Sequence, residues 1–468
     1  MAAPAGGTDP QMGVLADLLS FESLLTIDND GRAAPNLAAR WSRSDDGLLW
    51  KFELRDDVKF HDGTPVSATL VAEILNTAMR RPGTLAVAPS FQQVSSVAAE
   101  GRTGLTVKMT KPSALLLSDL AFVNIARGTS QQVGTGPFIT ESRDDKQIVM
   151  RRFDEYREGP PAIQRVELNA FPTVRNAWTA LMRGEIDFLY EVGTDAAEFV
   201  EGESSVQTFS FLRSYTVLLG FNLRHPVLRS REVRQALNRS IDRDALVRVA
   251  LRGRGRPAQG PIWPSHWASS QTTPTYSYNR EAAVLGFAAA GLDKVKKTKG
   301  MPSRFQFRCL VYPPLERMAL MIQKQLFEVG VDMTIELAEL PEIAGRAARG
   351  DFETFLIWQV TGRSLTWPYL FWHSPEPGRP VFLNSGYSAA DVTLDQVRYA
   401  RTDEEFRNAV AAFQEVIHND PPGIFLAWEE RMRAVSRDFR VPPLEPGRDV
   451  VSNLWRWEPA QQTAVSVQ

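Results

Sequence analysis

Residues able to carry out catalysis or to bind a metal are few in this chain of 468 residues, and they are scattered. The five histidines do not form an HExxH pattern or another metal-binding spacing. They are His61, His225, His266, His373 and His418. No GxSxG turn, Walker loop or glycine-rich turn between a strand and a helix accompanies them. The sequence therefore favours a protein that is not an enzyme, with no metal site and no cofactor.

Cys309 is the only cysteine, so an internal disulfide and a cysteine-based zinc site are both excluded. It lies in the apolar run FQFRCLVY, which is more typical of a buried strand than of a reactive thiol.

An arginine-rich stretch offers another kind of chemistry. From Arg213 to Arg256 there are eleven arginines against three acidic residues, a local charge of +8. Such a patch can bind an anion or nucleic acid. The spacing also fits two amphipathic helices, with Val233 and Leu237 facing the core and the arginines facing water. We favour the second interpretation, in which Asp242 caps the second helix.

Several of the eleven tryptophans fall in segments rich in Pro, Gly and Ser. Trp263 lies in PIWPSHW, and Trp358 and Trp367 lie in IWQVTGRSLTWPYLFWH. Core packing accounts for most tryptophans in proteins. A tryptophan on a loop, however, often lines a cleft. Both possibilities stay open at this point.

The composition is that of a globular protein with balanced charge. Hydrophobic residues make up 43% and charged residues 23%, and the net charge is −2. This balance argues against a nucleic-acid partner. No apolar stretch reaches the ~18 residues that span a bilayer. Residues 1–7 do not have the pattern of a secretory signal, and the length allows two or three domains.

The first half of the chain contains clear local signals. Residues 50–54 alternate between apolar and charged side chains, which predicts a half-buried strand. Ser67 and Thr173 are expected to cap the helices that follow them. A strand is predicted at 186–190.

The second half repeats this alternation of helices and strands. An apolar stripe over 315–329 predicts a helix, and 331–337 alternates as a strand. Thr402 and Glu405 form a capping box ahead of another helix, and the apolar segment 423–428 comes after it. These patterns predict α/β domains and more than one lobe.

Several strings follow one another along nearly the whole chain. The most distinctive is FELRDDVKFHDGTP at 52–65. Before it come FESLLTIDNDG, PNLAARW and SDDGLLW, and after it GTGPF, ALMRGEID, GFN, VRQALNRSIDRDA and SGYS. In this order the chain resembles the family 5 extracytoplasmic solute-binding proteins of ABC importers, which take oligopeptides, dipeptides, nickel chelates, opines and some oligosaccharides.

The resemblance implies a two-lobed periplasmic-binding-protein fold (type II, cluster C) with an inserted small domain and a hinged cleft. Lobe I would comprise 1–32, 133–230 and 437–468. The small domain would comprise 33–132, and lobe II 231–436. The ligand would bind between the lobes, and hinge closure would follow.

The resemblance also implies positions for ligand contacts. Glu22 of FESL matches a carboxylate that faces the cleft, and Trp358 matches a cleft tryptophan. Asn384, ahead of SGYS, matches a polar residue at the cleft edge. The plainer alternatives are a solvated Glu22 and an Asn384 that forms an Asx-turn. Trp263, from the Pro-containing loop, is added to the predicted lining.

The chain departs from the family where peptides are recognised. Peptide binders carry an Asp three residues after the tryptophan, and here that residue is Thr361. A neutral residue beside Arg363 cannot hold a buried ammonium group, whose unpaired burial costs on the order of several kcal/mol. We therefore expect an anionic or neutral polar ligand that contacts Arg363, with Trp358 and Trp367 as stacking surfaces.

Two further departures concern the architecture. The strand that normally opens these proteins is missing before residue 8, and the segment between Pro112 and Gly134 is short. They suggest a trimmed or divergent member of the family, or a chain whose start lies further upstream.

The function implied is that of the solute-binding component of an ABC importer. Such a protein is exported to the periplasm or held at the outer face of the membrane, and it works as a monomer. Its partners are a peptide-like, opine-like or saccharide solute and a membrane permease. A ligand sensor or scaffold on the same fold stays open, although no helix-turn-helix precedes residue 20. An enzyme is disfavoured by the missing catalytic residues.

Overall fold

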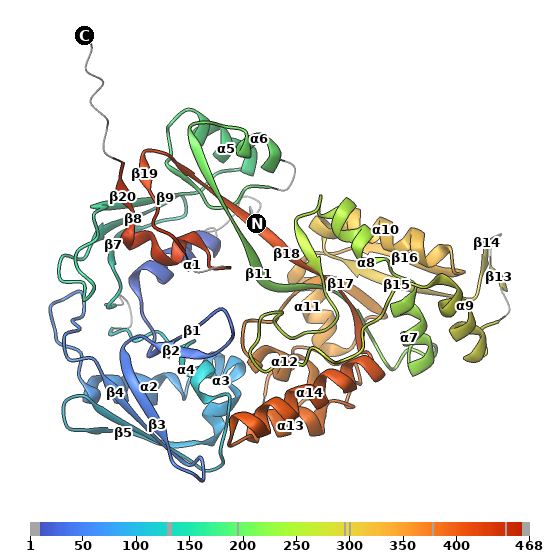
Figure 1. Ribbon diagram of the computed structural model, residues 1–468, viewed down its shortest axis with the longest axis horizontal. Coiled ribbons are helices and arrows are strands. Elements are labelled where there is room, and N and C mark those ends of the chain that lie inside the picture. The colour runs from blue at the N-terminus through green and yellow to red at the C-terminus, as the bar shows by residue number, and fades with distance from the viewer. Residues whose placement is uncertain are drawn as a thin grey trace.

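The protein is described by a computed structural model covering residues 10–128, 133–193, 196–293, 296–298, 301–376, 379–444 and 447–460. It has the two-lobed α/β architecture that the sequence predicts (Figure 1). Two long strands run from one lobe into the other. The predicted domain boundaries stay predictions.

The first lobe, lobe I, is built on a three-stranded antiparallel sheet of order β7-β8-β9 that contacts helix α1. Met12, Leu15 and Leu19 of α1 pack into a core with Phe138 and Trp457. The elements here are α1 (Pro10–Ser20), β7 (Phe138–Arg143), β8 (Gln147–Arg152), β9 (Arg165–Asn169), α5 (Val174–Met182), β10 (Phe188–Leu189), α6 (Ala197–Glu201), β19 (Phe439–Arg440), η4 (Val450–Arg456) and β20 (Glu458–Pro459).

A smaller unit continues lobe I around a four-stranded sheet of order β3-β4-β6-β5. The predicted strand at 50–54 is β4, and its apolar side chains Trp50, Phe52 and Leu54 are buried. Ser67 caps α2, because its hydroxyl accepts a hydrogen bond from the amide of Leu70. The elements are β1 (Leu25–Ile27), β2 (Ala33–Pro35), β3 (Ala38–Arg43), β4 (Leu49–Leu54), α2 (Ala68–Ala78), α3 (Pro82–Val87), η1 (Pro89–Gln93), β5 (Val94–Glu100), β6 (Gly104–Met109) and α4 (Leu116–Leu120).

A seven-stranded sheet joins the lobes. Its order is β10-β18-β11-β17-β15-β16, and β12 also pairs with β18. Strands β11 (Val206–Phe221) and β18 (Gly423–Ser436) are paired with each other along most of their length. Because β10 of lobe I pairs with the end of β18, and β17 (Thr354–Val360) pairs with the end of β11, these two strands belong to both lobes.

The second lobe, lobe II, has a mixed sheet in which β15 pairs in parallel with both β16 and β17. Apolar clusters cover its two faces. The elements are α7 (Arg231–Arg239), α8 (Arg243–Ala245), η2 (Leu246–Ala250), β12 (Gly255–Pro257), α9 (Arg280–Ala289), β13 (Lys296–Thr298), β14 (Met301–Ser303), β15 (Phe305–Val311), η3 (Pro313–Leu315), α10 (Glu316–Phe327), β16 (Val331–Leu337), α11 (Leu340–Arg349), α12 (Thr366–Trp372), α13 (Asp391–Tyr399) and α14 (Asp403–Asn419).

Cys309 confirms its prediction as a buried strand residue. It lies in β15 beside Thr354 of β17 and is fully buried. Burial raises the pKa of its thiol to about 12, so the thiolate is suppressed at neutral pH.

Most of the predicted caps are confirmed, with one correction. The hydroxyl of Thr173 accepts from Asn176, and that of Thr402 accepts from the amide of Glu405 at 3.0 Å. The carboxylate of Glu405, however, accepts from the amide of Arg401 at 2.6 Å instead of that of Thr402. The capping box is therefore only half formed, because its acidic partner reaches one residue further back.

Two predicted strands have different lengths in the structure. The strand predicted at 186–190 is only two residues long, since β10 pairs with β18 at Phe188 and Leu189 alone. The segment predicted at 423–428 is the start of β18, which continues to Ser436 because it crosses into lobe I.

The arginine-rich stretch was predicted to face water, and for two residues this is wrong. Arg234 and Arg243 are only 2% and 4% exposed. Arg234 donates to the carbonyl oxygens of Pro421 and Leu228, and Arg243 donates to that of Phe425. A guanidinium can be buried when carbonyl groups satisfy its five N–H donors, and these two tie α7 and α8 to the start of β18. Asp242 caps α8 as predicted.

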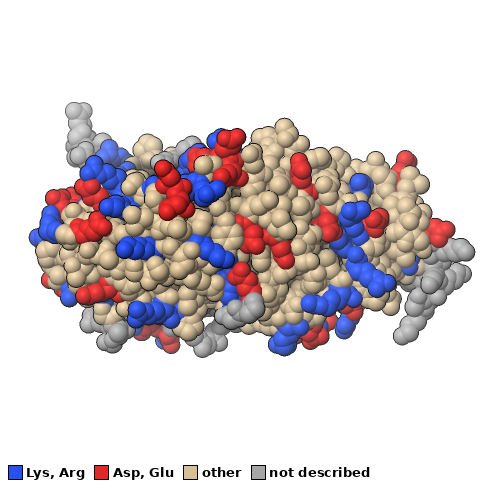
Figure 2. Space-filling model, turned by 90° about the horizontal axis from the view of Figure 1, so that it is seen from below, with Lys and Arg blue, Asp and Glu red and all other residues tan. Residues whose placement is uncertain are grey.

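Charges of both signs are scattered over the face shown in Figure 2, in line with the small net charge. In the described ranges, no helix has both the length and the apolar character needed to cross a membrane.

Candidate functional site

Polar and aromatic side chains gather where β11, β17 and β18 pass between the lobes. We call Arg213 and Tyr215 of β11, Trp358 of β17, and Glu429 and Arg431 of β18 the hinge cluster. All five are buried or half-buried. They lie on the strands that both lobes share, so any ligand held there contacts the junction itself.

A bulge in β11 positions Arg213. The register with β18 pairs Leu212 with Glu430 and then Thr216 with Trp428. Three residues of β11, 213–215, therefore stand opposite one residue of β18. Such an irregularity bends a strand and re-aims its side chains, and it is frequent beside functional sites.

Thr361 fixes this bulge. The carbonyl oxygen of Ser214 accepts hydrogen bonds from the Thr361 amide at 3.2 Å, from the Gly362 amide at 3.1 Å and from the Thr361 hydroxyl at 2.9 Å. Thr361 is buried. The residue at the position where peptide binders carry an Asp thus holds the backbone that carries Arg213.

Two guanidinium groups flank the ring of Trp358. The Arg431 Cζ lies 4.9 Å from the ring centroid and the Arg213 Cζ lies 5.6 Å from it. Arg213 also lies 4.0 Å from the ring of Tyr215, and Tyr312 packs edge-on against Trp358 at 5.5 Å. These are cation–π and aromatic contacts that favour a fixed Trp358 ring.

The charged side chains of the hinge cluster interact with one another and with Glu191. Arg431 forms ion pairs with Glu191 and with Glu429, the latter at 3.1 Å. Burial raises the pKa of Glu429, and the guanidinium groups of Arg431 and Arg213 oppose this effect. Arg213 makes no hydrogen bond or ion pair with the described residues, although it is half-buried.

An unpaired indole group adds a second unused donor. The Trp358 Nε1 is buried and has no hydrogen-bond partner in the described part of the chain. Buried donors are nearly always paired, and an unpaired one costs ~1–3 kcal/mol. Arg213 and Trp358 together can bind an anionic group and stack against a planar or apolar part of the same molecule. In the described ranges, no three His, Cys, Asp or Glu side chains gather as metal ligands would.

Trp263 and Arg363, also predicted as ligand contacts, lie in a different place that we call the turn contact. Here the β1–β2 turn meets the loop that carries Trp263. The indole of Trp263 donates to the carbonyl of Asn29 at 2.6 Å, and Arg363 donates to the carbonyl of Gly447 at 3.0 Å. The Arg363 Cζ lies 5.6 Å from the Trp263 ring. Both side chains thus hold lobes I and II together.

Glu22 is buried inside lobe I, at 8% exposure, so the alternative of a solvated carboxylate is wrong. Its Oε1 accepts from Arg157 at 3.2 Å and from the hydroxyl of Tyr156 at 3.4 Å. Burial raises its pKa, and the charge of Arg157 opposes this. Its role as a ligand contact stays a prediction.

Trp367 and Asn384 have different neighbours. Trp367 packs with Phe371 and Phe382, at ring distances of 6.3 and 5.9 Å. Asn384 is held by Arg224, which follows the lobe II end of β11 and donates to both its backbone and side-chain oxygens. Both residues stay predicted contacts.

Sequence reasoning missed Arg213, Glu429 and Arg431. One signal was present in the sequence. Arg213 is the one charged residue in the otherwise largely apolar run SFLRSYTVLLGF. A charged residue inside a largely apolar strand often has a functional reason. The high number of arginines between 213 and 256 could not by itself distinguish Arg213 from the other arginines of that stretch.

The fold and the hinge cluster define a two-lobed binding protein. The model of the bacterial extracellular solute-binding proteins, family 5 (middle part), matches residues 32–378. This chain belongs to that family. Its members are the solute-binding components of ABC importers, the class that the sequence predicts.

Individual relatives agree with this assignment. The nickel-binding periplasmic protein of Escherichia coli is 27% identical over 72% of this chain and 70% of its own length. The dipeptide-binding protein of the same organism is 26% identical over 88% and 84%. The crystal structure of NikA from Brucella suis in complex with Fe(III)-EDTA has a TM-score of 0.84 at 20% identity, covering 98% of this chain and 99% of that one.

Proposed function

We propose that this chain captures a polar solute bearing a carboxylate, or a similar anionic group, at the hinge cluster. The observation that carries the proposal is the half-buried guanidinium of Arg213, which makes no hydrogen bond or ion pair with the described residues and interacts with Glu191 and Glu429 only at longer range. A charge-assisted hydrogen bond to an anion supplies a direct contact of this kind. Trp358 offers an N–H donor and a ring face beside it.

A peptide with a free amino terminus fits this site less well. Thr361 stands where peptide binders have an Asp, and its hydroxyl is already used by Ser214. The acids in the hinge cluster region, Glu191 and Glu429, are paired with Arg431. An α-ammonium group would have to compete with Arg431 for Glu191 and Glu429, and it would lie near the positive charge of Arg213. Both effects make binding of a free amino terminus less favourable.

The setting proposed for this function is outside the cytoplasm. One relative is named a nickel-binding periplasmic protein, and the proposed partner is a membrane permease that receives the solute from the closed, monomeric form. The turn contact belongs to this closed arrangement, since its hydrogen bonds join the two lobes. A solute favours closure only if it binds the closed form better than the open one.

Native mass spectrometry of the freshly purified chain tests the proposal first. A retained small molecule that carries an acidic group is the expected result. Calorimetry then compares that compound with di- to pentapeptides that have free or acetylated amino termini. Tight binding of ordinary peptides that acetylation abolishes would contradict the proposal.

Two matched variants make the test specific to the site. Arg213→Met should weaken binding of the retained compound about 10- to 100-fold, which corresponds to one lost charge-assisted bond. Arg363→Met makes the same chemical change at the turn contact and should alter affinity by less than about threefold. Equal losses in both variants would show that Arg213 acts only through lobe closure.

A further inference from the structure

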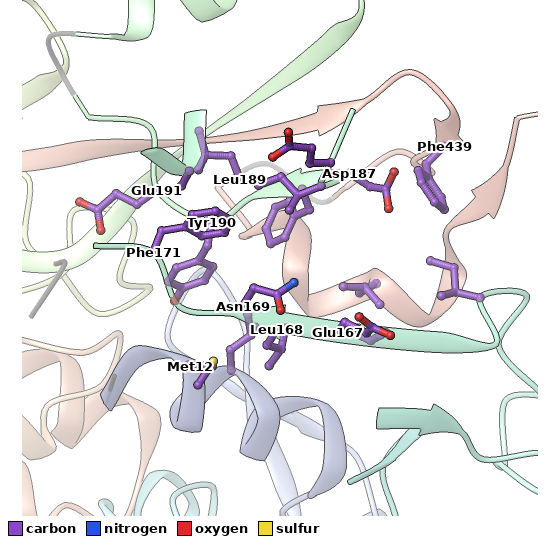
Figure 3. A pocket seen from close by; sticks show the side chains of 18 of the residues that line it. Met12, Glu167, Leu168, Asn169, Phe171, Asp187, Leu189, Tyr190, Glu191 and Phe439 are labelled. Carbon is purple, nitrogen blue, oxygen red and sulfur yellow. The ribbon is translucent and has the colours of Figure 1, made fainter. Parts of the chain in front are cut away.

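A cavity of about 410 Å³ lies between the smaller unit of lobe I and lobe II, and no residue of the hinge cluster lines it. Arg32 lines it from the turn between β1 and β2 and Arg43 from the end of β3, while Trp267 and Asp403 line it from lobe II. The groove shown in Figure 3 has a similar volume, about 430 Å³, but residues of lobe I alone line it. Only a molecule in the first of these cavities would touch both lobes.

Arginines approach this cavity from both lobes. The Cζ atoms of Arg32 and of Arg407 in α14 lie 4.0 and 5.7 Å from the centre of the same Trp267 ring. Arg43 donates to the backbone carbonyl of Arg401, next to α14. Like charges that face each other across a contact make that contact less favourable. A bound anion would offset this repulsion.

The carboxylates beside the cavity pair with only two of these four arginines. Neither Arg43 nor Arg407 forms an ion pair in the described part of the chain, and both donate to backbone carbonyls. A guanidinium has five N–H donors, so Arg43 can bind a further acceptor without displacing a carboxylate. The existing ion pairs are those of Arg32 with Asp403 at 3.2 Å and with Asp30 at 3.7 Å, and that of Arg401 with Glu405 at 3.8 Å.

Three buried polar side chains of the lining add uncharged donors. His266, Trp50 and Ser364 are at most 8% exposed. The Trp50 Nε1 and the Ser364 Oγ have no hydrogen-bond partner among the described residues. The His266 Nδ1 accepts from the amide of Ala268 at 3.2 Å, which leaves the proton of the neutral ring on Nε2. Burial lowers the pKa of His266 to about 4, so the ring is a neutral donor at pH 7.

We infer that this cavity binds a small molecule that carries a multiply charged oxyanion, a phosphate-type group or a polycarboxylate, and that the bound molecule favours the closed arrangement of the lobes. Its oxygens accept from Arg43 on one side and from the donors around Trp267 on the other. Because the lining comes from both lobes, the molecule binds the closed arrangement better than the open one. The inference rests on the proposed closure but not on the proposed solute.

Calorimetry of the full chain tests the site, with pyrophosphate and citrate as probes and glucose as the uncharged control. We expect 1:1 binding of at least one anion and none of glucose, and the anion that binds more tightly identifies the type of oxyanion. Binding of glucose alone, or of none of the three, would overturn the inference.

Two arginines of the same strand provide matched variants. Arg43→Met should weaken binding of the tighter probe at least about tenfold. Arg40→Met removes an exposed guanidinium of β3 that pairs with Glu53 at 2.5 Å and does not line the cavity, and it should change the affinity less than about threefold. Equal losses would reveal a general attraction of anions to positive charge and would overturn the inference.

Arg213→Met separates this cavity from the hinge cluster, where an anion is also proposed to bind. A loss of probe affinity in Arg213→Met that exceeds the loss in Arg43→Met would place the probe at the hinge cluster and overturn the inference. The proposal for the hinge cluster would then still stand.

Amide hydrogen exchange tests the effect on closure. Two amides donate across the contact between the lobes, that of Trp267 to the carbonyl of Asp30 at 2.9 Å and that of Ala114 to the carbonyl of Arg398 at 2.7 Å. The tighter probe should slow their exchange in the unmodified chain but not in Arg43→Met. Exchange at an unchanged rate with the probe bound would overturn the claim that it favours closure.

Discussion

Two tryptophans lie where the lobes meet, and they are held in opposite ways. Trp263 donates its indole N–H to the carbonyl of Asn29, and the nearby Arg363 donates to that of Gly447. Trp358 lies close to two guanidinium groups, and its indole N–H has no partner in the described residues. Both were predicted as ligand contacts, Trp358 because it matches a cleft tryptophan of the family and Trp263 because it lies in a Pro-containing loop.

The difference shows how to separate a structural contact from a binding site. The turn contact satisfies its donors with backbone carbonyls, so its stability needs no further molecule. In the described residues, the hinge cluster leaves the Trp358 indole N–H and the Arg213 guanidinium without hydrogen bonds, which is costly unless a ligand accepts from them. The predictions that follow are arranged to test this contrast, starting with the largest effect.

Arg431→Met should be the most damaging change. It removes the ion pairs with Glu191 and Glu429 and leaves Glu429, which is 5% exposed, without an ion-pair partner. Breaking a buried pair in this way costs about 3–5 kcal/mol of unfolding free energy. Urea unfolding measures it. Arg448→Met, at the pair with the more exposed Asp28, is the control and should cost about 0–1 kcal/mol. Similar losses of unfolding free energy in the two variants would contradict the contrast drawn here between the hinge cluster and the turn contact.

Asp119→Asn should change how stability depends on pH. Asp119 is fully buried and accepts from Thr366 of lobe II at 2.8 Å and from the hydroxyl of Ser90 at 2.6 Å. Burial raises its pKa to about 6, against 3.8 for an ordinary aspartate. The folded protein therefore holds a proton that the unfolded chain releases, and stability falls as pH rises from about 4 to 6.

The size of that effect is about 2–3 kcal/mol across the window. Thermal or urea unfolding at several pH values between 4 and 7 should show a flatter profile for Asp119→Asn. If the free energy of unfolding depends on pH in the same way in both proteins, other groups determine that dependence. The contact between Asp119 and Thr366 would then make no electrostatic contribution to it.

The two tryptophans can be compared directly by substitution with Phe, which keeps an aromatic ring and removes the N–H. Trp263→Phe should lose about 1 kcal/mol of stability, because its hydrogen bond to Asn29 is lost. Trp358→Phe in ligand-free protein should lose less from hydrogen bonding, since no bond is broken. Its affinity for the retained solute should fall about tenfold. If Trp358→Phe instead lost more stability and Trp263→Phe lost more affinity, Trp358 would be the structural contact and Trp263 the ligand contact.

Thr361→Val should have the smallest effect. It removes one of three donors to the Ser214 carbonyl and leaves two amides in place. We expect a loss of stability below about 1 kcal/mol and a two- to fivefold weaker affinity through looser placement of Arg213. Thr361→Ser, which restores the hydroxyl, should recover the affinity. If Thr361→Val binds the solute as tightly as the unmodified protein, the amides of Thr361 and Gly362 are sufficient to hold the bulge.

The parts of the fold that sequence predicted are those set by local rules. The strand at 50–54 and the caps Ser67 and Thr402 depend on residues within a few positions of each other. The extent of β11 and β18 could not be predicted, because it results from pairing across some 200 residues of chain. The burial of Arg234 has the same cause, since one of its acceptors is Pro421.

The site was predictable only in part for the same reason. Trp358 was found through its motif, and Thr361 was recognised as a departure from it. Arg213 owes its importance to a bulge, and a bulge follows from the register between two distant strands. No local pattern encodes that register.

The bulge also determines how force is transmitted. It lies on the two strands that both lobes share, so in the proposed hinge closure a ligand there sits close to the axis of rotation and has a short lever arm. A small displacement at 213–215 then corresponds to a larger one at contacts between the facing surfaces of the lobes. Molecules of somewhat different size can therefore be told apart by how completely the outer hydrogen bonds close, even where their contacts with Arg213 are the same.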